Sequence, residues 1–241
     1  MKIGVCCPTY CRPLLLGRLV HCFLQQTHDN FKLFVVDDAG QYESKDYGKW
    51  EMISLKKRFP NLGAKRQFCV DLLDSSYDGY QIADDDDAYW PHALSSVAKV
   101  LENAPWAQCR HVYETVRPGV LGITPAFGKR PLDWGYGGCW SYRLDAMRHL
   151  GGYLDAPGAD DLRLARKFHA RFGDSANSTE GTHPWYWYCR EPGVQKVSDE
   201  GIEFWEKREA YACEAVEKIN VGWNGPNLYD WEVIPDNPRP W

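Results

Sequence analysis

The chain has 241 residues, of which 44% are hydrophobic and 25% are charged, and its formal net charge is -5 at pH 7. A negative net charge gives no electrostatic attraction to nucleic acid or to an acidic membrane, and no apolar run approaches the ~20 residues that span a bilayer. The N-terminus lacks a secretory signal pattern, and an odd number of cysteines, nine, favours reduced and mostly buried thiols. We therefore expect a cytoplasmic protein without stable membrane insertion, and nucleic-acid binding is not indicated.

The first half of the chain alternates between strand and helix patterns. The apolar residues of 31–36, FKLFVV, form an almost continuous run before Asp37 and Asp38, which is typical of a strand buried on both faces of a parallel sheet. Strand–helix–strand order predicts βαβ units with right-handed crossovers. The predicted strands are 2–7, 31–40, 50–57 and 77–87, and the predicted helices are 14–26, 61–76 and 92–104.

The second half is less regular. We predict a strand at 109–117 and helices at 141–152, 159–173 and 203–219, followed by an irregular arm at 220–241. No internal repeat or low-complexity linker divides the chain. The sequence therefore predicts one α/β domain, residues 1–219, built on a mostly parallel sheet flanked by helices.

Polar residues gather just after several predicted strands, at the edge where open α/β sheets bind ligands. The first two strands bring Thr9, Tyr10, Arg12 and Asp38 to this edge. At the start of the 61–76 helix, Lys65 and Arg66 stand where cations and free amides hold a phosphate or contact a base. The sequence contains neither GxxxxGK[ST] nor GxGxxG, so neither the P-loop nor the dinucleotide fingerprint is present.

Four consecutive carboxylates, Asp84–Asp87, follow the fourth predicted strand. Adjacent carboxylates raise one another's pKa unless a cation neutralises them, and Mg²⁺ or Mn²⁺ suits one or two carboxylates plus substrate phosphates. On an extended segment, Asp84 and Asp86 would point to one side and Asp85 and Asp87 to the other. The alternative is an acidic surface turn that caps the next helix.

Three segments in the order expected of one family carry a resemblance. The segment GVCCPTYCRPLLLGRLVHCFLQQTHDNFKLFVVDDAG resembles the opening of a family 2 glycosyltransferase with the GT-A fold, which has a P-T-Y-N-R-P-like loop and a strand ending in V-V-D-D. NLGAKRQFCVDLL is similar to the family segment N-x-G-x-x-x-A-R-N, with Gln67 in place of the last asparagine. YQIADDDDAYWPHAL resembles the D-x-D strand end with its following proline. The resemblance covers roughly residues 3–95.

The resemblance implies an inverting, metal-dependent glycosyltransferase that uses a nucleoside-diphosphate sugar, a UDP-sugar being favoured, and a sugar or other hydroxyl acceptor. It implies a nucleotide-sugar-binding half at 1–103 and an acceptor and catalytic half at 104–219. The residues implied at the nucleotide sugar are Pro8, Thr9, Tyr10, Arg12, Asp38, Lys65, Arg66, Asp84 and Asp85. The implied ligands of Mn²⁺ or Mg²⁺ are Asp86, Asp84 and His183, with Asp85 able to take either role of the D-x-D pair.

In this family the catalytic base is an aspartate in an E-D-like motif at the start of a helix. Here the matching positions are Asp160 and Asp161, without the glutamate, and we favour Asp161 as the base. Two acids at a helix N-terminus are also explained by the helix dipole alone. For the acceptor, the loop LDWGYGGCWSY suggests Trp134, Tyr136 and Trp140 as a sugar platform, with core packing as the alternative for each.

Two other functions fit parts of this pattern. A nucleotidyltransferase also uses acidic metal ligands, but it would show a glycine-rich basic loop after the first strand, and PTYCRP lacks glycine. A non-catalytic carbohydrate-binding protein on the same fold would explain the missing glutamate.

Overall fold

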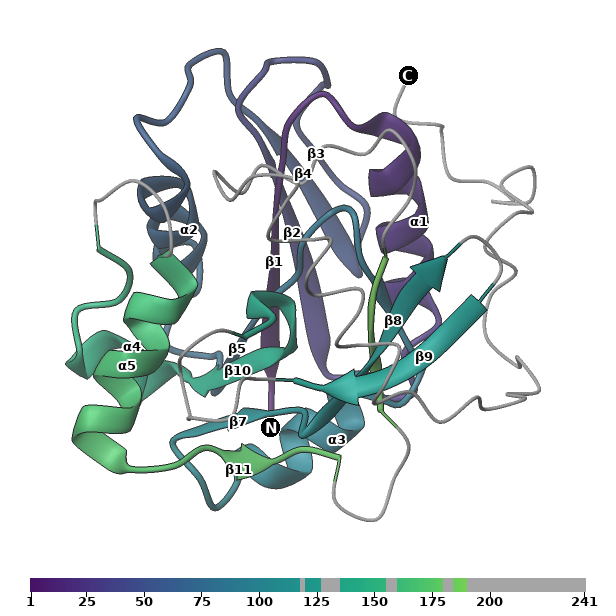
Figure 1. Cartoon of the computed structure of the whole chain (residues 1–241). Coiled ribbons are helices and arrows are strands. Elements are labelled where there is room, and N and C mark those ends of the chain that lie inside the picture. Colours follow the sequence, from purple (N-terminus) through teal and green to yellow (C-terminus); the bar gives the residue numbers. More distant parts are fainter. Residues whose placement is uncertain (118–119, 127–134, 155–159, 180–183, 190–241) are drawn as a thin grey trace.

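The computed structural model describes residues 1–117, 120–126, 135–154, 160–179 and 184–189. Their central element is an eight-stranded sheet in the order β11-β7-β10-β5-β1-β2-β4-β3 (Figure 1). Four adjacent strands at its centre run parallel: β1 (Ile3–Thr9), β2 (Phe31–Asp37), β4 (Trp50–Ser54) and β5 (Gly79–Ile82). These four strands confirm the predicted parallel sheet.

The parallel strands are buried because their sequences are apolar on both faces. All residues of β1 are buried, including Cys6 and Cys7, which fill the sheet interior. In the parallel register, Thr9 at the end of β1 lies opposite Asp37 at the end of β2. The polar residues that follow these strands therefore meet at one edge of the sheet.

The remaining strands of the central sheet were not predicted. They are β3 (Lys45–Asp46), β7 (Trp106–Gln108), β10 (Trp140–Arg143) and β11 (Ala176–Asn177). The helix predicted at 141–152 is wrong in its first part, because Trp140–Arg143 pair antiparallel with β5 and β7 before α4 (Leu144–His149) begins. A buried strand of four residues is too short to show a period that distinguishes it from a helix.

A smaller four-stranded sheet has the order β6-β12-β8-β9. It contains β6 (Ala88–Tyr89), β8 (His111–Arg117), β9 (Val120–Pro125) and β12 (Tyr186–Tyr188). The strand predicted at 109–117 corresponds to β8. Because β6 directly follows the four aspartates, this sheet is joined to the acidic segment.

The helices complete the layers around the sheet. They are α1 (Pro13–Leu24), α2 (Leu62–Asp71), α3 (Ala93–Leu101), α4 and α5 (Asp160–Phe172), with a 3-10 turn, η1, at Gly137–Cys139. In Figure 1, α2, α4 and α5 lie on one side of the central strands and α1 on the other. The Asn61 side chain caps α2 by accepting a hydrogen bond from the Ala64 amide at 2.9 Å.

The eight described cysteines are free thiols, and all except Cys11 are buried. No helix in the described ranges is both long and apolar enough to cross a membrane. The helix predicted at 203–219 and the arm predicted at 220–241 lie outside the described residues, so the predicted division of the chain at residue 219 stays a prediction.

Candidate active site

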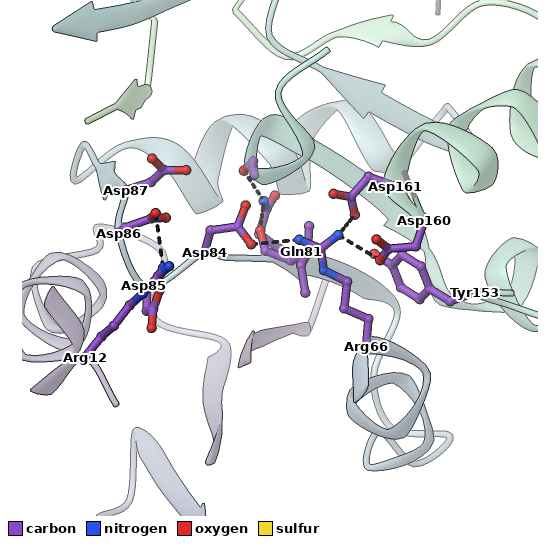
Figure 2. A network of polar contacts seen from close by, with 12 residues as sticks. Arg12, Arg66, Gln81, Asp84, Asp85, Asp86, Asp87, Tyr153, Asp160 and Asp161 are labelled. Carbon is purple, nitrogen blue, oxygen red and sulfur yellow. Dashed lines mark hydrogen bonds and ion pairs between the residues drawn. The ribbon is translucent and has the colours of Figure 1, made fainter. Parts of the chain in front are cut away.

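The four aspartates form a turn rather than an extended strand end. The Asp87 amide donates to the Asp84 carbonyl at 3.2 Å, which closes the segment on itself. The alternation expected of an extended segment is therefore wrong: Asp85 and Asp86 share one arginine, while Asp84 meets another (Figure 2). In the described structure, arginine side chains contact three of these acidic groups.

The loop after β1 contacts the middle of the acidic turn. Thr9 Oγ1 donates to Asp85 Oδ2 at 2.7 Å, and Arg12 Nη1 contacts Asp85 Oδ1 at 2.9 Å and Asp86 Oδ2 at 3.2 Å. Burial is the largest influence on Asp85 and raises its pKa to about 6 although Arg12 lowers it. Thr9, Arg12 and Asp85, all predicted at the nucleotide sugar, are thus brought together.

Arg18 also supports this turn and was not predicted. Its side chain is 3% exposed, and Nη2 donates to the Asp86 carbonyl at 2.7 Å. The signal in the sequence is an arginine inside the apolar helical run LLLGRLVHCFL, where a charge needs a buried partner.

On the other side of the turn, Arg66 joins Asp84 to the start of α5. Arg66 Nη2 contacts Asp84 Oδ1 at 2.8 Å, while Nη1 contacts Asp160 Oδ2 at 2.9 Å and also forms an ion pair with Asp161 (Figure 2). Arg66 is 3% exposed. Arg66 thus contacts a residue 94 positions away in the sequence, and its one buried guanidinium serves both the acidic turn and α5.

Asp161, the predicted catalytic base, has a pKa raised to near neutrality. Burial raises its pKa to about 7, with Asp160 and Asp84 adding to the rise and Arg66 opposing it. A carboxylate with a pKa near neutrality is suited to accept a proton at neutral pH. Asp160 is buried in the same ion-paired group.

The side chains of Asp38 and Lys65 support the end of β1, where Thr9 lies. Lys65 Nζ donates to Asp38 Oδ1 at 2.6 Å and to the Thr9 carbonyl at 2.5 Å, and both side chains are buried. Asp38 Oδ2 also accepts from the Phe59 amide at 3.1 Å. The Lys65 ammonium, expected near a phosphate or a base, is thus paired with a carboxylate and a carbonyl.

The same edge carries one exposed aromatic residue, Tyr10, which is 47% exposed. The Arg58 guanidinium lies 3.5 Å from the centre of its ring. Pro8, predicted at the nucleotide sugar, is buried near the end of β1 and is not part of the exposed surface.

Asp87, the last aspartate of the turn, connects the turn to the smaller sheet. Asp87 is 1% exposed; it accepts a hydrogen bond from the Tyr186 hydroxyl and another, at 3.3 Å, from the Cys189 amide. Asp87 therefore ties the acidic turn to β12 of the smaller sheet.

The predicted acceptor platform is placed mainly in the core. Tyr136 is 4% exposed and Trp140 is 1% exposed, so neither ring offers a face to an acceptor in this structure. Their burial favours the alternative, that both rings pack in the core. Trp134 and His183 lie outside the described residues.

The acidic turn is also the predicted site of a divalent cation. No group of three or more His, Cys, Asp or Glu side chains is arranged to hold a metal within the described ranges. Mg²⁺ and Mn²⁺, however, are commonly held by one or two carboxylates plus substrate phosphates. The two carboxylates predicted for this role contact different arginines: Asp84, whose side chain is 29% exposed, pairs with Arg66, and Asp86, at 8%, pairs with Arg12.

Solved structures with a similar overall fold identify the fold class of the chain. The chain is similar to residues 1-349 of S. aureus TarS in complex with UDP-GlcNAc, with a TM-score of 0.63, 15% identity, and coverage of 90% of this chain and 68% of that chain. The fold is that of a GT-A glycosyltransferase. This confirms the predicted fold class.

A second similar structure is the mannosyltransferase PcManGT from Pyrobaculum calidifontis in complex with GDP-Man and Mn2+. Its TM-score is 0.56 at 18% identity, and the match covers 88% of this chain and 61% of that chain. The match to another structure of TarS residues 1-349 covers only 60% of that chain. No protein-family model and no curated protein matches the sequence, so membership of family 2 stays a prediction.

Proposed function

We propose that this protein is an inverting glycosyltransferase that moves a sugar from a nucleoside-diphosphate sugar to an acceptor hydroxyl. The observation that carries the proposal is the buried network in which Arg66 joins Asp84, at the carboxyl edge of the parallel sheet, to Asp161 on α5. It places a basic carboxylate beside the edge where an α/β sheet binds nucleotides. The fold shared with two nucleotide-sugar complexes supports the same function.

In the proposed reaction, Asp161 removes the proton from the acceptor hydroxyl. The acceptor oxygen then forms a bond to the anomeric carbon on the face opposite the diphosphate, and the bond from that carbon to the diphosphate oxygen breaks. The proton remains on Asp161, and the nucleoside diphosphate leaves with the electron pair. Proton transfer of this kind needs a base with a pKa near the working pH, as Asp161 has.

Asp84 and Asp86 are the residues that would hold a Mg²⁺ or Mn²⁺ ion. The ion would neutralise charge on the departing diphosphate. Thr9, Tyr10, Arg12 and Asp38 line the donor side of this edge, where Tyr10 offers its ring to a base. Because the TarS structure contains UDP-GlcNAc and the PcManGT structure GDP-Man, UDP-sugars and then GDP-sugars are the first donors to test.

Product analysis tests this function against nucleotidyl transfer. We expect the protein, supplied with a UDP- or GDP-sugar, Mn²⁺ and a panel of glycosyl acceptors, to release nucleoside diphosphate; release of pyrophosphate would show nucleotidyl transfer instead.

Asp161→Asn should bind donor but lose at least about a hundredfold in kcat, the range in which a general base contributes. Asp145→Asn, which removes an exposed carboxylate on α4, is the matched control and should retain turnover. Donor binding without turnover in the unchanged protein would favour a carbohydrate-binding role.

A further inference from the structure

Arg66 is placed so that one guanidinium serves both halves of the proposed site. Nη2 faces Asp84 after β5, and Nη1 faces Asp160 and Asp161 at the start of α5 (Figure 2). A planar guanidinium can make such contacts on two edges at once, which a lysine ammonium cannot reproduce. Arg66 therefore links Asp84, on the proposed donor side, to Asp161, the proposed base.

The Asp161 carboxylate also lies close to Gly137 of η1. A Cβ atom added to Gly137 would overlap the Asp161 carboxylate group, so this close approach requires glycine. Asp161 is thus confined between the Arg66 side chain on α2 and the Gly137 backbone. The Arg66 ion pair and the close approach of Gly137 both restrict where its oxygen atoms can lie.

Charged groups around Asp161 come from several elements. Arg66 approaches from α2, Asp84 from the turn after β5, and Asp160 from the same helix. The phenol groups of Tyr142 on β10 and Tyr153 also lie within its electrostatic reach. Of these groups, Arg66 favours the ionised carboxylate, whereas Asp84 and Asp160 oppose it.

We propose that Arg66 is the positioning residue of the base: it holds the Asp161 carboxylate against Gly137, stabilises its ionised form, and links it to the donor side through Asp84. This inference rests on the proposed function, since it assigns Arg66 its role in that reaction. It does not require Arg66 to touch the substrate. Its consequence is that loss of Arg66 should impair proton transfer in a pH-dependent way.

The pH profile of turnover provides the first test. With donor saturating, kcat should be measured from about pH 5 to about pH 9 for the unchanged protein, Arg66→Met and Asp160→Asn. In Arg66→Met, the acidic limb of the profile should move up by about one to three pH units, because an opposite charge is lost. In Asp160→Asn it should move down, because a like charge is lost. If Arg66 had only a structural role, Arg66→Met would lower kcat equally at every pH.

Arg66 is buried among carboxylates, so its loss endangers folding. The double variant Arg66→Met with Asp160→Asn removes one cation and one anion together and carries the test if the single variant does not fold. Its acidic limb should lie above that of Asp160→Asn alone. Equal limbs in these two variants would overturn the proposal.

A carboxyl titration followed by carbon-detected NMR gives a readout that needs no activity. The Asp161 signal, assigned by its loss in Asp161→Asn, should titrate at higher pH in Arg66→Met, or in the double variant relative to Asp160→Asn. If the unchanged protein transfers sugar while neither the titration nor the limb moves, the Arg66 proposal is wrong and the proposed function stands. If the titration moves but no sugar is transferred from any donor, the proposed function fails and the hold of Arg66 on Asp161 is still supported.

Discussion

Asp161 is surrounded by other carboxylates and is partly shielded from water. Burial, Asp160 and Asp84 raise its pKa to about 7, against an ordinary value near 3.9 for an aspartate in an unfolded chain. The folded protein therefore binds the Asp161 proton more tightly than the unfolded chain does. The stability gained from this proton is complete below about pH 4 and is lost as the pH rises to about 7.

The predicted consequence is a pH-dependent effect of Asp161→Asn on stability. Asparagine cannot ionise, so the variant escapes this loss, and its free energy of unfolding relative to the unchanged protein should rise by about 1 to 3 kcal/mol between about pH 5 and about pH 8. Denaturant unfolding at both pH values measures the difference.

Asp145→Asn provides the control. The ion pair with Arg143 lowers the pKa of Asp145, so this carboxylate is fully ionised over the same pH range. Its effect on the free energy of unfolding should be the same at both pH values. A relative stability of Asp161→Asn that does not change with pH would contradict the pKa given to Asp161.

At the scale of elements, α2 organises the site because three successive residues on it contact different parts of the chain. Lys65 contacts Asp38 and the Thr9 carbonyl, and Arg66 contacts acidic groups in the turn after β5 and on α5. Gln67 Oε1 accepts a hydrogen bond from the Tyr153 amide at 2.8 Å. Gln67, which departs from the asparagine of the family pattern, thus holds the chain that leads to α5.

Adjacent glycines allow this contact to be tested. Gly151 and Gly152 both have positive φ, at 74° and 66°, so alanine at either pays a backbone cost of about 1–2 kcal/mol. A Cβ at Gly151 meets open space, whereas one at Gly152 overlaps the Gln67 side-chain amide. Gly152→Ala should therefore be less stable than Gly151→Ala by about 1 kcal/mol, the worth of the displaced hydrogen bond.

Thermal or denaturant unfolding of the two variants measures this difference. Gly152→Ala should also lower kcat more than Gly151→Ala, since Gln67 and Arg66 are neighbours on α2. Equal stabilities would show that Gln67 moves aside without cost.

The elements that could be predicted from the sequence are those with long apolar patterns. β1, β2, β5 and α5 follow from such runs, and their order brings Thr9 and Asp85 to one edge. β6 and β12 are two and three residues long, too short to carry a period, and their strand state depends on pairing with distant residues. For this reason the sequence predicted β8 of the smaller sheet but neither β6 nor β12.

The sequence indicated which residues meet at the acidic turn better than it indicated how they contact one another. The family-like motifs brought Arg66 and Asp161 into one hypothesis, but nothing local in the sequence shows that one guanidinium contacts both Asp84 and Asp161. The same is true of Arg12, whose partners Asp85 and Asp86 are more than seventy positions away. Ion pairs between distant residues depend on tertiary structure, which short sequence patterns do not encode.

At the scale of the whole molecule, the acidic turn joins most parts of the fold. The loop after β1 reaches it through Thr9 and Arg12, α2 through Arg66, and the smaller sheet through Tyr186 and Asp87. A ligand that binds this turn therefore contacts a segment to which β1, α2 and the smaller sheet are all connected. Its binding should stabilise the folded protein as a whole.

This leads to a prediction about how a divalent cation and a nucleoside diphosphate act together. Asp84 and Asp86 already contact arginines, so Mn²⁺ alone replaces existing ion pairs and gains little, while UDP alone brings negative charge to an acidic edge. Together, the cation offsets the charge of the diphosphate. We expect Mn²⁺ plus UDP to raise Tm by more than the sum of their separate effects, with a stabilisation of about 2.7 kcal/mol when the ligand is at a hundred times its Kd.

Thermal unfolding with Mn²⁺, UDP, both, or Mn²⁺ with uridine distinguishes the contributions, because uridine lacks the diphosphate that the cation would bridge. Asp86→Ala should lose the joint effect, whereas Asp145→Asn should keep it, since Asp145 is exposed on α4. An equal rise with Mn²⁺ alone would mean that the aspartates form a cation site without the diphosphate. A full rise with UDP alone would mean that Arg12 and Arg66 hold the diphosphate without a metal, and that the arginines already present at the acidic turn are its cations.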